Sequence, residues 1–163
     1  MVVLALLALA GSGCGKNPSG PDDRTASVRI DGRTRDFVID SCGIDGRTVF
    51  VVGRPADGGD EPGQIILQAV VGFADREHQE IDLDAVAVTV DLSATERVGA
   101  IGPESLERLG GTPPAPGTIE SAERRGSRIT IRAEAEHLTM DNDGTGASAG
   151  PLTVDTRCAD PAS

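Results

Sequence analysis

The stretch RITIRAEAEHL, from Arg128 to Leu138, decides the fold, because apolar side chains alternate in it with charged or polar ones. Ile129, Ile131 and two alanines occupy every second position, and charged residues and a threonine stand between them. Successive side chains of a β-strand point to opposite faces, so this period of two predicts one apolar and one charged face. We therefore predict an antiparallel strand with one side in the core and one side in water.

A second strand is predicted shortly after the first. We expect residues 141–150 to form a loop, because they are rich in Asp, Asn, Gly and Ser. In the stretch from Leu152 to Cys158 that follows, Leu152, Val154 and Cys158 share a face by residue parity. The last of these side chains should therefore point toward the core.

Two Asp-Gly pairs indicate hairpin turns in the first third of the chain. Asp31-Gly32 separates the runs 28–30 and 37–39, and Asp45-Gly46 precedes the run 48–52. Asp-Gly is favoured between two strands because tight hairpin turns need residues with positive φ. Two such turns close together predict a meander of three strands.

The middle of the chain adds two apolar runs. Residues 54–63 consist mainly of Gly, Pro and acidic residues and are predicted to be a loop. Residues 64–73 are apolar almost throughout, which favours a strand covered on both faces, although a short buried helix gives the same pattern. The apolar positions of residues 81–92 change parity near Ala85, so we expect a β-bulge or a bend there.

Regular structure is predicted to lapse between residues 93 and 117. Within this segment, residues 103–110 begin with Pro and Glu and end with Gly, which is typical of a short helix. Residues 112–117, with the sequence TPPAPG, should be irregular.

These elements predict a mainly β fold, namely an antiparallel β-sandwich or a strongly curved sheet with at most one short helix. The 163 residues suffice for one domain with a modest core. We expect that single domain to span residues 27–158, followed by a tail at 159–163.

The N-terminal segment carries a different signal. Ten apolar residues are followed by Gly11-Ser12-Gly13 and then Cys14. An apolar run this short is typical of a signal peptide and is too short to cross a bilayer. The pattern resembles the lipobox of bacterial lipoproteins, in which cleavage before the cysteine is coupled to its lipidation. The resemblance implies a signal peptide at residues 1–13, a lipid anchor on Cys14 and a flexible tether at 14–26.

Composition excludes some classes of partner. The net charge is −11, from 15 basic and 26 acidic residues, and the aromatic residues are three phenylalanines. Nucleic-acid binding needs clustered Lys and Arg, and base stacking needs aromatic side chains. We therefore predict no nucleic-acid partner, and the total charge also predicts repulsion from anionic lipid headgroups.

The cysteines predict the compartment. If Cys14 is lipidated, Cys42 and Cys158 remain as an even pair in an exported chain, where a disulfide is favoured over two free thiols. Neither belongs to a Cys-x-x-Cys unit, so the sequence predicts no redox motif and no metal or cofactor. We expect a disulfide between Cys42 and Cys158 and a location on the outer face of the cell membrane.

Five features together resemble a known family, the mycobacterial lipoprotein antigens of the LpqH type. They are the lipidated cysteine with its tether, the hairpin at residues 28–32, Cys42, the strand that begins GSRITI at residue 126, and the closing strand from Leu152 to Cys158. The resemblance covers most of residues 27–158. It implies a small, mainly β domain on an actinobacterial cell envelope, without a known catalytic site.

Four possible chemical sites were weighed against simpler interpretations. Residues 146–150 match Gly-x-Ser-x-Gly, but no helix follows Ser148 and no histidine lies downstream, so we interpret them as a flexible hairpin loop. Residues 141–144 (DNDG) lack both end ligands of a calcium loop and are interpreted as a turn. The acidic segment 75–84 is interpreted as a solvated strand edge. His137, in phase with the apolar face of its strand, is predicted to be a buried, hydrogen-bonded histidine.

The leading functional hypothesis is a lipid-anchored, non-catalytic surface or interaction protein. The membrane is then its first partner, through the anchor. The alternative is a carrier of a hydrophobic ligand or lipid, enclosed by the apolar residues of a curved sheet. The candidate lining residues are Ile65, Ile66, Val70, Val71, Phe73, Val86, Val88 and Val90. The same residues would equally form a plain core.

Overall fold

The computed structural model describes residues 20–58, 66–139 and 141–159, and contains nine strands and one short helix within them. The elements are β1 (Thr25–Ile30), β2 (Arg33–Asp45), β3 (Thr48–Pro55), β4 (Leu67–Phe73), β5 (Ile81–Ser93), β6 (Glu96–Ile101), α1 (Pro103–Arg108), β7 (Thr118–Arg125), β8 (Arg128–Leu138) and β9 (Gly144–Arg157). The first strand begins two residues before the expected start of the domain.

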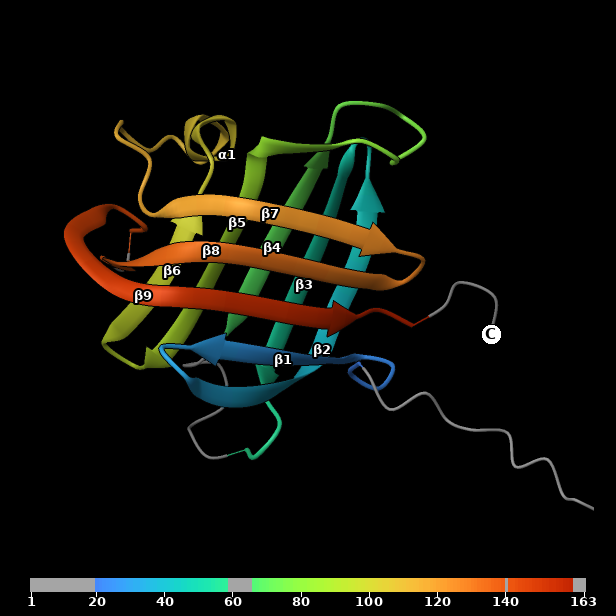
Figure 1. The fold of residues 1–163 in the computed structure, drawn as a ribbon, viewed down its shortest axis with the longest axis horizontal. Helices are drawn as coiled ribbons and strands as arrows, with labels where there is room; N and C mark the ends of the chain where they lie inside the picture. Colours follow the sequence, from blue (N-terminus) through green and yellow to red (C-terminus); the bar gives the residue numbers. More distant parts are fainter. Residues whose placement is uncertain (1–19, 59–65, 140, 160–163) are drawn as a thin grey trace, which may run out of the picture.

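All nine strands belong to one antiparallel sheet that bends into two layers. The strand order is β6-β5-β4-β3-β2-β1-β9-β8-β7, and a further pairing of β6 with β8 closes the sheet on itself. In Figure 1 the strands β7, β8, β9 and β1 cross in front of the steeply inclined β2 to β6. The prediction of a strongly curved antiparallel sheet with at most one short helix is thus confirmed.

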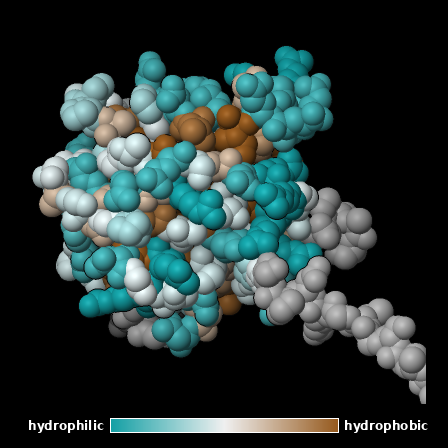
Figure 2. All heavy atoms as spheres, viewed as in Figure 1, coloured by the Kyte–Doolittle hydropathy of each residue, from teal (hydrophilic) through white to brown (hydrophobic). Residues whose placement is uncertain are grey.

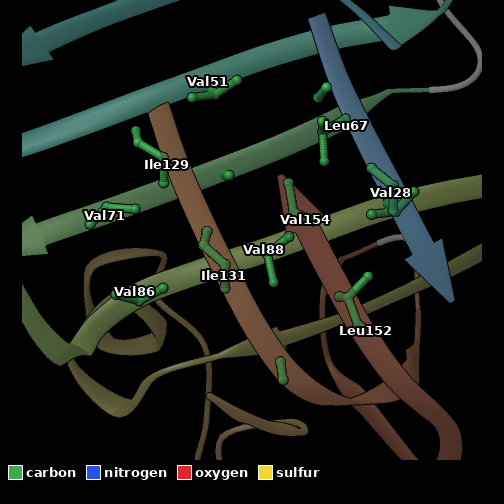
Figure 3. Close-up of a cluster of buried hydrophobic side chains, with 14 of the residues drawn as sticks. Val28, Val51, Leu67, Val71, Val86, Val88, Ile129, Ile131, Leu152 and Val154 are labelled. Atoms are coloured by element: carbon green, nitrogen blue, oxygen red, sulfur yellow. The ribbon is translucent and has the colours of Figure 1, made fainter. Parts of the chain in front are cut away.

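The core lies between the two layers. Ile129 and Ile131 of β8 point inward from the front layer, and Val86 and Val88 of β5 face them from the back layer (Figure 3). All four side chains are buried, as are Ala133 and the other inward residues of β8. The alternation in the β8 sequence therefore corresponds to a real division between core and solvent.

The predicted hairpin turns are confirmed. Asp31 and Gly32, with φ of 44° and 75°, connect β1 to β2 in the left-handed conformation that such a turn requires. Gly46, with φ of 58°, lies in the turn between β2 and β3. These turns make β1, β2 and β3 the expected meander.

The parity change near Ala85 also has the expected origin. The register between β4 and β5 shifts after the pair Val71 and Val86, and the next pair joins Phe73 to Ile81. At this irregularity β5 approaches β4 closely, because a Cβ built on Gly72 would lie 2.3 Å from the Cβ of Ala85. Glycine leaves the space that the bend of β5 occupies.

The helix lies outside the sheet and packs on the outer face of β5 and β6. Residues of these strands are therefore buried on both faces of the sheet. Pro103 stands in its first turn, and Leu106 packs against Ala87, Ile101 and Leu138 in a small second cluster. In Figure 1 the helix lies beside the end of β6. The prediction of a short helix is confirmed, with its end at Arg108 rather than residue 110.

Several predicted loops are wrong, because they contain strands. Residues 93–117 include β6, residues 141–150 include the first half of β9, and β3 continues through Arg54 and Pro55. β6 is covered on both faces, so it lacks alternation, and its central Gly99 packs directly under the backbone of Val88. The first half of β9 consists of Gly, Ala, Ser and Thr and is held in the sheet by its pairing with β8.

The inward position of Ile131 can be tested by truncation. We expect Ile131→Ala to lower the free energy of unfolding by about 2–5 kcal/mol, because the side chain is fully buried between the layers. The matched control is Glu134→Ala, three positions along the same strand and exposed, which should change stability by about 0.5 kcal/mol or less. Chemical denaturation of both variants checks this, and equal losses would contradict the assignment of faces.

Candidate functional site

The predicted lipidation residue, Cys14, lies outside the described residues. The chain enters the described part at Gly20 and joins the sheet at Arg24, whose backbone amide donates to the carbonyl oxygen of Arg157 at 2.8 Å. The end of the predicted tether therefore lies against the last residue of β9.

Cys42 and Cys158 are joined by a disulfide, as the cysteine pattern predicts. Their Cα atoms are 5.9 Å apart, although 116 positions separate them in the sequence. Cys42 lies in β2 and Cys158 directly follows β9, and these two strands flank β1 on either side. The disulfide therefore links the two neighbours of β1 close to the point where β1 begins.

An apolar cleft of about 470 Å³ opens beside this disulfide. Its apolar lining includes both cysteines, Ile44, Val49 and Ile129, and Arg124 and Ser127 add polar atoms. The cleft borders Ala159, the last described residue of the chain.

Residues 146–150 do not form the turn that a hydrolase nucleophile needs. Ser148 lies within β9, is exposed, and pairs with Glu136 of β8. Its Oγ accepts a hydrogen bond from the backbone amide of Gly150 at 3.2 Å. The interpretation of this segment as a flexible loop was wrong, but a serine inside a strand also lacks the strand-to-helix elbow of that class of enzymes.

In the acidic segment 75–84, one carboxylate accepts hydrogen bonds from backbone amides of the same segment. The carboxylate of Asp75 accepts hydrogen bonds from the amides of Gln79 and Glu80, at 3.0 and 2.7 Å. The first of these bonds in particular lowers the pKa of Asp75 below its ordinary value of 3.8. Because a lowered pKa favours the ionised form, the turn is stabilised above the ordinary pKa and loses this contribution as the pH falls.

A buried ion pair, missed by the sequence analysis, lies between β5 and β6. Asp91 and Arg97 face each other across this hairpin, with Nε 2.5 Å from Oδ1, and their side chains are 4% and 12% exposed. Arg97 also donates to the Oδ1 of Asn142, at 3.0 Å. The segment 141–144 is thus a turn, as predicted, and its asparagine contacts this pair. The sequence signal was an Asp and an Arg at facing positions of a hairpin that was not recognised.

A groove of about 640 Å³ opens at the end of the sheet formed by the β1–β2 turn and the β5–β6 turn. Its floor is apolar, and its rim is charged. The floor residues are Val28, Ile30, Val90, Leu92, Val98 and Ala149. The rim residues are Asp31, Arg33, Thr34, Arg35, Asp57, Glu96 and His137.

His137 is not the buried histidine that its parity predicts. Its side chain is 39% exposed at the rim of this groove, with Nδ1 3.7 Å from Oε1 of Glu96. The register of β8 with β9 shifts between Glu136 and Leu138, so Leu138 takes the buried position instead. A bulge that the sequence pattern does not reveal therefore moves the histidine outward.

The residues proposed to line a ligand cavity lie in different parts of the structure. Val71, Phe73, Val86, Val88 and Val90 are buried in the main core. Val70 packs near the helix in the second cluster, Ile66 is half-buried, and Ile65 lies outside the described residues. Most of the set thus contributes to packing between the layers.

Over residues 20–58, 66–139 and 141–159, no three or more His, Cys, Asp or Glu side chains are grouped so that they could hold a metal ion. Within the same part of the chain, no helix has the length and apolar character needed to span a membrane.

No protein-family model matches the chain, and no curated protein matches it.

The contribution of the disulfide can be measured directly. We expect the double variant Cys42→Ala/Cys158→Ala to lose about 4–5 kcal/mol of unfolding free energy, because the bond closes a loop of more than 100 residues. Reduction of the unmodified protein should produce a loss of similar size, and the reductant should leave the double variant unchanged. Equal denaturation midpoints for the variant and the oxidised protein would contradict this expectation.

The pair Asp91 and Arg97 offers a second test. We expect Asp91→Asn to cost about 3–5 kcal/mol, because the substitution leaves the guanidinium of Arg97 largely buried without its counter-charge. Asp40→Asn is the matched control, since Asp40 forms an exposed pair with Arg54 at 2.8 Å. The control should lose about 1 kcal/mol or less. A smaller loss for Asp91→Asn than for Asp40→Asn would show that burial does not determine the effect.

Proposed function

We propose that this protein is an exported lipoprotein of the cell envelope, held at the outer face of the membrane by acyl chains on Cys14. The observation that carries the proposal is the apolar run that ends in Gly11-Ser12-Gly13-Cys14. The disulfide between Cys42 and Cys158 supports export, because such bonds persist in oxidising compartments.

The β-domain is proposed to act by contact with a partner rather than by catalysis. Ser148, the one residue in a hydrolase-like motif, lies in a strand and bonds to the neighbouring backbone. The resemblance to lipoprotein antigens of the LpqH type supports the same interpretation, since it implies a small β domain presented on the cell surface.

Substitution of Cys14 tests the anchor. We expect the protein exported from an actinobacterial host to begin at Cys14, to carry acyl chains in its mass spectrum and to fractionate with membranes. Cys14→Ser should lose the acyl mass, because the hydroxyl cannot form the thioether. Ser19→Ala, five residues away, is the control and should remain acylated. An unacylated wild-type protein with an intact N-terminus would overturn the proposal.

A second candidate function is the binding of a hydrophobic ligand. The observation that favours it is the groove at the β1–β2 and β5–β6 turns, where an apolar floor adjoins Arg33 and Arg35. Such a combination suits a ligand with an apolar body and a polar end. The groove, rather than the packed interior, is the place where this ligand would bind.

Native mass spectrometry of the exported protein tests this candidate. We expect a lipid-sized adduct, and we expect added palmitate to bind to the unloaded protein. Leu92→Gln, in the floor of the groove, should weaken palmitate binding about tenfold, the effect of losing one well-placed apolar contact. Leu109→Gln, an exposed site after the helix, is the control and should leave binding unchanged. Absence of a lipid adduct, together with no binding of added palmitate, would exclude this function.

A further inference from the structure

The outer surface of the front layer carries three rows of side chains that the strand register aligns. The first row is Arg125, Arg128, Arg157 and Thr25, on β7, β8, β9 and β1. The second row is Glu123, Thr130, Asp155 and Ser27, and the third is Ser121, Arg132, Thr153 and Arg29. These twelve positions hold five arginines, five hydroxyl residues and two carboxylates. We call this surface the arginine face, and Figure 2 views the molecule from this side.

Three of the five arginines already have carboxylate partners. Arg128 holds Asp155 with two nitrogens, at 2.8 and 2.5 Å, which raises the pKa of the guanidinium. Arg125 lies 3.0 Å from Glu123, and Arg157 lies 2.7 Å from Asp23. Both carboxylates of the arginine face are therefore neutralised within it.

Arg29 and Arg132 are different. They flank Thr153 in the third row, which contains no carboxylate. The acidic residues bordering this row are Glu134, two positions after Arg132 on β8, and Asp36 of β2, which pairs with Ser27 diagonally next to Arg29. Among the described residues, neither guanidinium forms an ion pair or a side-chain hydrogen bond. Two cations on either side of a hydroxyl group are well suited to the oxygens of a phosphate group.

The arginine face is also hollowed. A depression of about 270 Å³ lies between Arg125, Arg128 and Arg132, with Thr130 and Thr153 at its base. It contains guanidinium and hydroxyl donors, and its two carboxylates, Glu123 and Asp155, are the ones paired above. The depression thus offers a place for an anionic headgroup beside Arg132.

This surface opposes the charge of the rest of the chain. Five arginines and two carboxylates give the twelve positions a charge of +3, and Asp23, which pairs with Arg157, lowers it to +2. Since the whole chain has a charge of −11, the remaining residues carry −13. At physiological salt, charges further away than about 8 Å are largely screened. An anionic surface placed against the arginine face would therefore interact mainly with the arginines.

The path of the chain brings this face near the membrane. A Cβ built on Gly20 would lie 3.0 Å from the Nη1 of Arg128, so the described chain begins against the arginine face. Five residues separate this point from Cys14, and the six residue steps from Cys14 to Gly20 span only about 20 Å when fully extended. If Cys14 is lipidated, the edge of the arginine face at Arg128 is held within about that distance of the lipid headgroups.

We propose that the arginine face docks on an anionic bilayer, with lipid phosphates bound between Arg29 and Arg132 and in the adjoining depression. The inference rests on the proposed lipid anchor, and it replaces the expectation that the negative total charge repels such lipids. The anchor supplies proximity, and the arginines determine which side of the domain faces the membrane.

Vesicle binding by the unlipidated chain tests the proposal independently of the anchor. Residues 15–163 contain every described strand and both disulfide cysteines, so they retain the whole sheet. We expect this chain to cosediment with vesicles of phosphatidylcholine mixed with phosphatidylglycerol and not with phosphatidylcholine alone. Binding should weaken as salt is raised.

The test variant is Arg29→Glu/Arg132→Glu. The control is Arg76→Glu/Arg108→Glu, which changes the charge by the same amount at the β4–β5 turn and the helix. The first should reduce binding about 30-fold or more, the loss expected for two membrane-facing arginines, and the control should change it less than about threefold. Arg29→Lys/Arg132→Lys should retain binding, because an ammonium group also pairs with phosphate.

Three results would overturn the proposal. The first is that the folded chain does not bind anionic vesicles. The second is that the Arg29/Arg132 variant and its control lose equal amounts of vesicle binding. The third is that inorganic phosphate, but not chloride of equal ionic strength, releases the chain from the vesicles. The last would indicate a site for a soluble anion. None of them affects acylation of Cys14, which the mass spectrum of the exported protein tests separately.

Discussion

Closure of the sheet through β6 and β8 is the constraint on which the rest of the structure depends. With few aromatic residues and many valines and alanines, a flat sheet of these strands would leave one apolar face in water. Bending brings the inner faces of the two layers together, and the pairing of Val98 with His137 holds them there. The front strands then cover the inner face of the back strands, and α1 covers only a small patch on the outer face at β5.

Closure also determines where functional groups can lie. The interior is filled mainly by aliphatic side chains, so the polar and charged residues gather at the rim of the groove beside the β1–β2 and β5–β6 turns and on the outer surface of the front layer. The disulfide and the entry of the chain at Gly20 lie at the same corner of the molecule. The front surface continues from this corner, which gives the domain one side directed toward the tether and another directed away from it.

The fold class could be predicted because several strands, especially β8, alternate regularly and are bounded by Asp-Gly turns. β6 could not be found in this way, since both its faces are covered and Gly99 contributes no side chain. β7 has a mostly polar sequence, TIESAERR, because only Ala122 and Ile119 turn toward the core from the edge of the sheet. Its pattern therefore resembles that of a solvated loop.

The disulfide could be predicted because Cys42 and Cys158 are an even pair in a chain whose N-terminal sequence predicts export. The arginine face could not, because its rows combine residues from four strands whose order and register the sequence does not reveal. The position of His137 depends on a register shift, and that of the pair Asp91 and Arg97 on a hairpin that the small residues of β6 conceal. These features could not be predicted because they depend on the register between strands rather than on composition.

The position of β1 has a mechanical consequence. This strand continues directly from the tether and is hydrogen-bonded along its whole length to β2 on one side and to β9 on the other. If Cys14 is lipidated, a force transmitted from the membrane through the chain before Gly20 would act along β1 and would load both rows of hydrogen bonds in shear. Cys42 and Cys158 tie β2 to β9 near the start of β1, so the disulfide limits the separation of the two flanking strands at this end. The pairing of β1 and the disulfide beside it would thus both oppose extraction of this strand by a pull on the N-terminal side of the chain.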